Sequence, residues 1–320
     1  MDYRGKRIVV TGGAGFIGSH LCRRLVELGA SEVVALDSLR YGDLSNLADT
    51  PSVRVEKHTL GTDDPALLAP LLDGADGLFH LAAEKHNQSI DSPRDVMRAN
   101  IEGTQALYAA ALTAGVPRVV FSSSLYAYGR MVGAPMREDD LPQPRTVYGI
   151  SKLTGEHLLA HAAKDGAMAS RVLRYFFVYG PRQWAGMGYK SVIIKNAERL
   201  LAGQRPLVVG DGTQALDYVF VDDVVDATLR ALATPVVDPS HVEVLNVSSG
   251  RAVPVNELLE ALCRIAGKPF SPEHALADWT AGTARAGENA KIAASLGWVP
   301  TTRLEDGLRR TWDFVAATSG

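Results

Sequence analysis

Apolar residues follow two alternating patterns along the first 180 positions of the chain. Short runs rich in Val, Ile, Leu and Phe predict buried strands, and longer segments with apolar residues at helical spacing separate them. The predicted strands span residues 7–11, 32–37, 53–59, 77–81, 118–123 and 171–178. The predicted helices span residues 15–28, 65–72, 94–114 and 148–164. This order predicts an α/β fold whose parallel sheet is covered by helices on both faces.

The pattern loosens after the Gly-Pro-Arg-Gln turn at residues 180–183. Here the sequence predicts helices over 189–202, 224–233, 256–266 and 304–316 and a strand over 206–209. Two segments rich in Pro, Gly, Asp and Thr, 235–240 and 269–283, are expected to be loops. We therefore expect a doubly wound α/β domain over residues 1–180, with later segments contributing, and a smaller C-terminal α/β lobe over residues 181–320.

A glycine-rich turn joins the first predicted strand to the first predicted helix. Gly12 permits a tight turn, Gly15 lets the backbone approach a pyrophosphate, and Gly18 lets the helix pack closely on the strand. Asp37 ends the second strand, 19 residues after Gly18, which is near the spacing of a ribose-binding carboxylate. Such a carboxylate repels a 2′-phosphate and favours NAD over NADP. Arg40 is the counter-argument, since it could pair with that phosphate.

A second group of residues points to proton transfer. Tyr148 and Lys152 are four positions apart at the start of a predicted helix, so the ammonium can lie near the phenol. A nearby positive charge favours phenolate and lowers the pKa of a tyrosine, which makes it a better base for a hydroxyl proton. Ser122 and Ser124 close an apolar strand at the carboxyl edge, where open α/β sheets place their sites. A serine there can hold a substrate hydroxyl or carbonyl.

Composition and charge narrow the function classes further. Hydrophobic residues make up 46% of the chain and the net charge is only −3, without a Lys- or Arg-rich run, so we expect no nucleic-acid partner. No apolar stretch is long enough to span a bilayer, and the N-terminus lacks the features of a signal peptide. Cys22 and Cys263 have no metal-like spacing. We expect a cytoplasmic protein without a metal site or membrane association.

The motifs together resemble an extended short-chain dehydrogenase/reductase of the nucleotide-sugar epimerase/dehydratase branch. They are TGGAGFIGSH from residue 11, HLAA at 80–83, SSS at 122–124, YGISK at 148–152, RYFFVYGPRQ at 174–183, GDGTQALDYVFVDD at 210–223 and LGWVP at 296–300. The resemblance implies a Rossmann domain of about seven strands, tightly held NAD, and a substrate-binding lobe for a nucleotide sugar that is UDP-, dTDP-, GDP- or CDP-linked. We favour a UDP-sugar among these. It also implies a homodimer formed through residues 94–114 and 148–164.

The resemblance also implies residue roles. Ser124, Tyr148 and Lys152 match the catalytic triad, and Asn100 matches a position that orders the site. The candidate cofactor-binding residues are Gly12, Gly15, Phe16, Ile17, Gly18, Asp37, Leu81, Ala82, Ala83, Asn100, Ser122, Tyr148, Lys152 and Tyr175.

Three departures from the family pattern affect the substrate site. The family has Asn where this chain has Phe177 and Arg where it has Leu216, and its Arg-Pro-Gly-Asp segment is not recognisable, although Arg285 could serve in its place. These positions commonly contact the diphosphate of the sugar nucleotide. The candidate substrate-binding residues are Phe177, Arg182, Lys190, Val192, Tyr218 and Arg285.

The reaction depends on a few residues beside the cofactor. Glu84 and His86 after HLAA are typical of hexose 4,6-dehydratases, but the Asp-Glu pair of those enzymes is replaced by Leu125 and Tyr126. Tyr126 could transfer a proton, with Glu84 or Lys85 completing the chemistry; alternatively Lys85 contacts NAD phosphates and Tyr126 only packs.

Our leading interpretation is an atypical dehydratase acting on a UDP-N-acetylhexosamine, which oxidises carbon 4 transiently and eliminates the 6-hydroxyl. As a whole the sequence is similar to the UDP-N-acetylglucosamine 5,6-dehydratases of tunicamycin-type antibiotic pathways. The alternative is a 4-epimerase, which needs only the triad. A remote alternative is a non-catalytic NAD-sensing protein.

Overall fold

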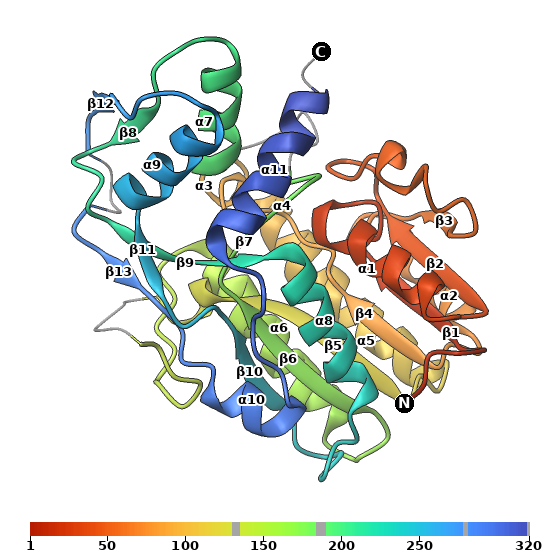
Figure 1. The fold of residues 1–320 in the computed structure, drawn as a ribbon. Helices are drawn as coiled ribbons and strands as arrows, with labels where there is room; N and C mark the ends of the chain where they lie inside the picture. The colour runs from red at the N-terminus through yellow and green to blue at the C-terminus, as the bar shows by residue number, and fades with distance from the viewer. Residues whose placement is uncertain (130–134, 184–189, 278–280, 319–320) are drawn as a thin grey trace.

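A seven-stranded sheet forms the centre of the protein (Figure 1). The computed structural model describes residues 1–129, 135–183, 190–277 and 281–318. The strand order is β10-β6-β5-β4-β1-β2-β3, and every neighbouring pair is parallel. The strands are β1 (Arg7–Thr11), β2 (Glu32–Asp37), β3 (Arg54–Lys57), β4 (Gly77–His80), β5 (Arg118–Ser124), β6 (Ala169–Tyr175) and β10 (Glu243–Val247). The predicted Rossmann-type α/β fold is confirmed.

The strand order reverses between β1 and β4. From β1 the chain first builds β2 and β3 on one side, and then β4, β5, β6 and β10 on the other. Loops leaving the carboxyl ends of β1 and β4 therefore run in opposite directions and leave a crevice between them. Every candidate catalytic residue lies at or after the carboxyl end of a strand on this edge of the sheet.

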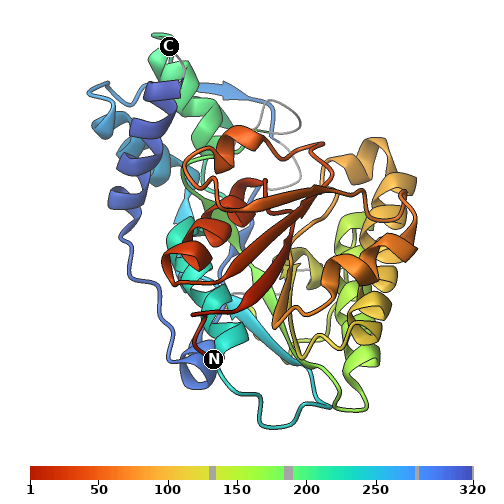
Figure 2. The ribbon, with the colours of Figure 1, turned by 90° about the vertical axis from the view of Figure 1, so that its right-hand side faces the viewer.

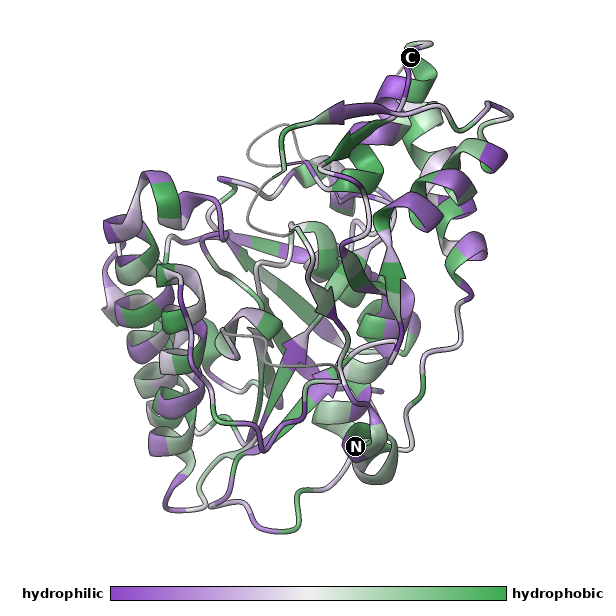
Figure 3. Ribbon diagram, turned by 90° about the vertical axis from the view of Figure 1, so that its left-hand side faces the viewer, coloured by the Kyte–Doolittle hydropathy of each residue, from purple (hydrophilic) through white to green (hydrophobic). Residues whose placement is uncertain are grey.

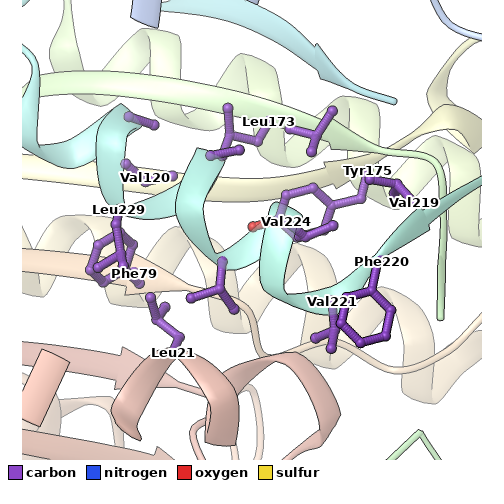
Figure 4. Packing of buried hydrophobic residues seen from close by; sticks show 14 of the residues in the cluster. Leu21, Phe79, Val120, Leu173, Tyr175, Val219, Phe220, Val221, Val224 and Leu229 are labelled. Carbon is purple, nitrogen blue, oxygen red and sulfur yellow. The ribbon is translucent and has the colours of Figure 1, made fainter. Parts of the chain in front are cut away.

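Helices cover both faces of the sheet because both faces are apolar. Along β1, Ile8 and Val10 pack into a cluster with α1 (Phe16–Glu27) and α8 (Val221–Ala233), whereas Val9 packs into a cluster on the other face. That other face carries α2 (Leu68–Leu72), α5 (Gly103–Thr113) and α6 (Val147–Ala163). Figure 2 shows the two helix layers, and Figure 4 shows Leu21 of α1 and Val224 of α8 among the sheet residues Phe79, Val120 and Leu173. The strict alternation of side chains along each strand produces this double cover.

The helix predicted over residues 94–114 contains an irregularity. It consists of α4 (Pro93–Met97), a π-helical turn (Arg98–Glu102) and α5. A π-helical turn widens the helix locally and often occurs at functional sites. Here it contains Asn100, which is 3% exposed and points into the protein beneath the loop that follows β4.

A smaller lobe lies at one end of the molecule (Figure 1). Its sheet pairs β9 (Ala215–Phe220) with β7 (Phe177–Tyr179), β11 (Ala252–Pro254) and β13 (Ala284–Arg285), and a separate pair joins β8 (Leu207–Val209) to β12 (Glu273–Ala275). Helices α7 (Val192–Leu201), α9 (Val255–Ile265) and α11 (Leu304–Thr318) pack together there. Green and purple segments along the helices in Figure 3 show their amphipathic character. The short helices α3 (Gln88–Asp91) and α10 (Ala290–Leu296) and the 3-10 turns Leu44–Leu47, Pro65–Leu67 and Leu125–Ala127 complete the described elements.

Three sequence predictions need correction. The strand predicted over 171–178 is two strands, because the chain leaves the large sheet at Phe176 and β7 pairs with β9 instead. The segment 269–283, predicted as a loop, contains β12, which gains a partner in β8. The helix predicted from residue 189 is described only from Val192, where Ser191 accepts a hydrogen bond from the Ile194 N–H and caps it; Tyr189 lies outside the described residues. All three reflect pairing or capping that sequence periodicity does not contain.

Across the described parts of the chain, none of the helices combines the length and apolar character that crossing a membrane requires. Cys22 and Cys263 are buried free thiols.

Candidate active site

A cavity of about 440 Å³ opens at the carboxyl edge of the sheet. Loops after β1, β2, β4 and β5, the β6–β7 segment and helix α6 all contribute to its walls. Its lining contains all six candidate catalytic residues and nearly all candidate cofactor residues: Gly12, Gly15, Phe16, Ile17, Gly18, Asp37, Leu81, Ala82, Ala83, Glu84, Lys85, Ser122, Ser124, Tyr126, Tyr148, Lys152 and Tyr175. The structure therefore brings together residues that are far apart in sequence.

The glycine turn is packed too tightly for any side chain. Gly12 has a φ of +73°, and a Cβ there would lie 2.9 Å from the Ala82 backbone nitrogen. A Cβ on Gly18 would lie 2.1 Å from the Gly12 carbonyl oxygen. Helix α1 begins after Gly15 without a side-chain cap on its first turn. Its backbone N–H groups and its dipole are thus available to an anion in the cavity, which fits the pyrophosphate of a dinucleotide.

Asp37 is placed to bind a ribose. Its carboxylate accepts hydrogen bonds from the backbone N–H groups of Ala14 at 3.0 Å and Leu39 at 2.8 Å. Burial raises the pKa of Asp37, and the two hydrogen bonds oppose that shift. Gly42 leaves room beside it, since a Cβ there would lie 2.7 Å from Asp37 Oδ1. A carboxylate in this position fits the ribose of NAD, whose hydroxyls donate hydrogen bonds.

Two loops meet across the cofactor end of the cavity, in a contact that we call the cofactor clasp: Arg40, Tyr41, Glu84 and Lys85. Arg40 Nη1 donates to Glu84 Oε1 at 2.7 Å, and Tyr41 OH donates to Glu84 Oε2 at 2.8 Å. The Lys85 ammonium lies 4.7 Å from the centroid of the Tyr41 ring. The Arg40 guanidinium therefore pairs with a carboxylate that the protein itself supplies, which weakens the argument for a 2′-phosphate partner.

Asn100 holds the Glu84 backbone of the clasp in place. Its side-chain oxygen accepts from the Glu84 N–H at 2.7 Å, and its amide donates to the Glu84 carbonyl at 3.1 Å and to Ser151 Oγ at 3.1 Å. The π-helical turn thus joins the loop after β4 to helix α6. Asn100 lies outside the cavity lining and acts on the site through Glu84.

Tyr148 and Lys152 lie on one face of α6, as their spacing predicts. The Lys152 ammonium donates to the Ser122 carbonyl at 2.9 Å and lies 5.7 Å from the centroid of the Tyr148 ring. Ser124 caps the following 3-10 turn, accepting from the Tyr126 N–H, and its side chain also hydrogen-bonds to Tyr148. The Ser124 hydroxyl, the Tyr148 phenol and the Lys152 ammonium are therefore neighbours in the site.

Burial dominates the ionisation of both groups. It raises the pKa of Tyr148 to about 12, and the hydrogen bond with Ser124 only partly opposes the shift. It lowers the pKa of Lys152 to about 7, with the Glu156 carboxylate acting in the opposite direction. The lowered tyrosine pKa expected from the sequence is therefore not found in the chain by itself, because loss of solvation outweighs the hydrogen bond with Ser124.

A wall of aromatic rings adjoins the triad. The His86 ring stacks on Tyr126 with centroids 4.4 Å apart, and both rings pack edge-on against Tyr148, at 6.0 Å and 5.8 Å. Leu125 points elsewhere, into an apolar cluster with Tyr128 and other buried residues. The polar character of this end of the cavity therefore comes from imidazole and phenol groups.

The comparisons with known proteins agree with this geometry. The family model described as "NAD dependent epimerase/dehydratase family" matches residues 8–247. The chain belongs to this family. A UDP-glucose 4-epimerase of Mycolicibacterium smegmatis is 35% identical over 96% of this chain and 98% of its own length.

Two solved structures are also similar over nearly their whole length. The UDP-glucose 4-epimerase of Thermotoga maritima, solved with UDP-glucose, has a TM-score of 0.90 and 33% identity, covering 98% of this chain and 100% of that one. The dTDP-glucose 4,6-dehydratase of Streptomyces venezuelae, solved with NAD, has a TM-score of 0.87 and 30% identity, covering 98% and 97%. Membership of the family makes this protein an NAD-dependent enzyme related to both reaction types.

The candidate substrate residues of this family member are dispersed. Phe177 and Arg182 line the cavity, and Arg182 pairs with Asp49 at 2.8 Å. Lys190 pairs with Glu198, and Val192 begins α7. The centroids of the Tyr218 and Phe177 rings are 6.1 Å apart. Arg285 pairs with Leu216 on the neighbouring strand. The described lining does not include these last four residues: Lys190, Val192, Tyr218 and Arg285.

Sequence reasoning missed Tyr41, and it considered His86 only as part of the motif after HLAA, without naming it among the site residues. Both follow the carboxyl end of a strand, Tyr41 after β2 and His86 after β4, and both line the cavity. Their position after a strand was a usable signal. Their contacts with Glu84 and Tyr148 arise only when the two loops meet in space.

Lys152→Met is expected to stabilise the fold while removing the ammonium beside Tyr148. The pKa of Lys152 is about 7 in the folded protein and near 10.5 when unfolded, so the unfolded state binds more protons between these values and stability rises with pH across that window. Methionine removes the cost of burying the charge, which should raise the free energy of unfolding at pH 7 by about 1–3 kcal/mol. Urea unfolding at pH 7, 8, 9 and 10 measures this.

The control is Lys195→Met, which replaces an exposed lysine of α7. A lower free energy of unfolding for Lys152→Met at pH 7, with the same pH dependence as the wild type between pH 7 and 10, would contradict this prediction.

Glu84→Gln is expected to loosen the cofactor. It keeps the side-chain shape but removes the charge that Arg40 and Tyr41 bind, a loss of about 1 kcal/mol for a partly exposed pair with one charged hydrogen bond. Bound NAD should then dissociate roughly 3–10 times faster, which rapid desalting and nucleotide quantification can follow. Glu27→Gln, which breaks an exposed pair with Arg24, is the matched control. Equal rates in wild type and Glu84→Gln would show that the clasp does not retain NAD.

Proposed function

We propose that this protein is a UDP-sugar 4-epimerase. Within the described ranges, the carboxylates that line the cavity are Asp37 and Glu84. Both lie at the cofactor end and are bound by other groups, Asp37 by two backbone N–H groups and Glu84 by Arg40 and Tyr41. Elimination of a hydroxyl calls for an acid near the leaving group, whereas epimerisation at carbon 4 requires only the Ser124, Tyr148 and Lys152 set. This arrangement is the main support for the 4-epimerase over our leading sequence interpretation.

The chain supplies a complete set of groups for oxidation at carbon 4. The residues around the glycine turn and Asp37 would hold NAD, which would supply the hydride acceptor and donor for carbon 4. Ser124 holds the substrate oxygen, Tyr148 takes the hydroxyl proton and later gives it back, and Lys152 stabilises the phenolate. Lys152 is held by the Ser122 carbonyl, so the ammonium stays beside the phenol throughout.

The dehydratase remains the second candidate because one observation favours it. His86 and Tyr126 lie stacked beside Tyr148 and both line the cavity, which gives this end of the site two groups able to transfer protons. Dehydratases of this family have an Asp-Glu pair where this chain has Leu125 and Tyr126. In a dehydration reaction, His86 and Tyr126 would take over the proton transfers of that acidic pair. The similarity to a dTDP-glucose 4,6-dehydratase is compatible with it.

Binding of the nucleotide sugar is assigned to the lobe side of the cavity. Arg285 is paired in register with Leu216, so the two side chains leave the sheet on the same face. A guanidinium at 285 can therefore occupy the region that an arginine at 216 would reach. Arg285 is 3% exposed, and its charge acts on His86. We assign it to the substrate diphosphate. The UDP nucleotide is supported by the similarity to UDP-sugar epimerases.

A homodimer is the proposed assembly. Large apolar side chains are exposed on the helices around α6: Ile90 (72%), Met97 (51%), Leu112 (39%) and Ile150 (47%). Exposed apolar side chains gathered on adjacent helices are typical of a protein interface. A second copy of the chain is the occupant that the family resemblance implies.

Incubation with UDP-glucose and with UDP-N-acetylglucosamine tests the function. We expect an isomer of unchanged mass, detected by chromatography and mass spectrometry, and Tyr148→Phe should lower kcat by a factor of about 100 or more because the proton acceptor is lost. Tyr3→Phe is the control, since its buried hydroxyl bonds to the Leu229 carbonyl away from the cavity. A product lacking one water would overturn the epimerase in favour of the dehydratase. Unchanged biological activity of Tyr148→Phe would favour an NAD-sensing role.

Ile150→Glu tests the dimer. A charge at the centre of an apolar contact is poorly solvated when the surface is covered, so the dimer dissociation constant should rise at least about tenfold. Light scattering over a dilution series measures it. Leu141→Glu, at a 78% exposed position outside these helices, is the control. A monomeric wild type at all concentrations would contradict the proposal.

A further inference from the structure

His86 and Tyr126 form a pair of proton-transfer groups beside the triad. The rings are stacked at 4.4 Å with an interplanar angle of 23°, and each contacts the Tyr148 ring edge-on. They come from different loops, His86 after β4 and Tyr126 after β5. All three line the cavity. Of these three residues, only Tyr148 has a role in the proposed epimerisation at carbon 4.

Hydrogen bonds fix the backbone on both sides of the pair, and the contacts of the His86 ring with Tyr126 and Tyr148 position the ring itself. Ser89 donates to the His86 carbonyl through both its N–H, at 3.0 Å, and its hydroxyl, at 2.5 Å. On the other side, the Tyr126 backbone N–H donates to Ser124 Oγ at 3.3 Å, so the backbone that carries this ring is tied to Ser124. Proton transfer needs such fixed positions near the reacting atom.

The surroundings keep the imidazole in its basic form. Burial lowers the pKa of His86, and the positive charge of Arg285 lowers it further. At neutral pH the ring is therefore uncharged and can accept a proton. The proposed oxidation at carbon 4 would provide such a proton, because a ketone at carbon 4 acidifies the hydrogens on carbons 3 and 5.

We propose that the His86–Tyr126 pair exchanges a carbon-bound proton next to the transient ketone of the bound sugar. The proposal rests on the proposed oxidation at carbon 4 and adds a second activity at a neighbouring carbon. Carbon 3 and carbon 5 flank carbon 4, and the pair serves whichever of the two faces it. The ligand class is a nucleotide 4-ketohexose.

The proposed step balances without any further reagent. The His86 nitrogen takes the proton from the carbon next to the ketone, and the electron pair of the broken C–H bond moves into a new C–C double bond while the ketone becomes an enolate. Tyr126 OH and the imidazolium then exchange protons with solvent. Return of a proton to the same carbon restores the ketone with a solvent-derived hydrogen. Nothing is oxidised or reduced in this step.

Deuterium labelling tests the pair directly. The full-length protein with its bound NAD is incubated with UDP-glucose in D2O, and NMR and mass spectrometry measure both the epimer and the deuterium on carbons 3 and 5. We expect carbon-bound deuterium with the wild type. His86→Phe and Tyr126→Phe each keep an aromatic ring for the stack but lose a proton-transfer group. Their ratio of deuterium incorporated to epimer formed should fall about tenfold or more.

The ratio separates a chemical role from a packing role, because a packing defect lowers both quantities together. Tyr3→Phe serves again as the control, and its ratio should match the wild type. An epimer without carbon-bound deuterium, or an unchanged ratio in both variants, overturns the proposal while leaving the epimerase intact.

A second substrate makes the inference independent of the proposed function. If no epimer forms, exchange is measured on supplied UDP-4-keto-6-deoxyglucose, which already carries the ketone. Label in the wild type that His86→Phe loses supports the pair even though the epimerase has failed, and absence of label overturns it. A product that lacks one water and carries solvent deuterium supports the pair and overturns the epimerase.

Discussion

The site depends on one close backbone contact, the packing of the Gly12 turn against the loop after β4. A Cβ on Gly12 would lie 2.9 Å from the Ala82 nitrogen, so the two loops touch without an intervening side chain. Thr11 strengthens the contact, because its hydroxyl accepts from the Ala82 N–H and bonds to His80. These loops leave the two strands at which the sheet order reverses. The glycine turn and the loop that carries Glu84 and His86 are therefore fixed relative to each other.

Helix α6 shows what this placement costs. Tyr148 and Lys152 point toward the cavity, and one turn further Glu156 pairs with Arg174 at 2.7 Å and accepts from Ser123. Burial lowers the pKa of Lys152 to about 7, which means that the fold bears a penalty for keeping the ammonium there. The Glu156 carboxylate offsets part of that penalty, because it raises the lysine pKa. The buried ion pair thus supports the charge on which the chemistry depends.

Sequence motifs predicted the local parts of the fold and site well. The bounds of β1 and β2 matched residue for residue, and the glycine turn, Asp37 and Tyr148–Lys152 all line one cavity. Features made by long-range pairing were not predictable. Strand β10 joins the sheet by pairing with β6, about 70 positions earlier in the chain. The two residues of β13 form a strand only because they pair with β9. Tyr41 entered the site for the same reason, since its partner Glu84 belongs to another loop.

The two reactions considered for this protein share their first step and diverge at the ketone. The groups that form the ketone are common to both and carry no information about its fate. That fate depends on which side chains face the neighbouring carbons. Among the described lining residues, the Glu84 carboxylate is bound by Arg40, and an imidazole stacked on a phenol lies beside Tyr148. Such a pair can move a proton on and off carbon, yet neither group is as strong an acid as a carboxylic acid toward a leaving hydroxyl. This difference in acidity is the reason for our proposal that the pair exchanges a proton with carbon and does not eliminate a hydroxyl.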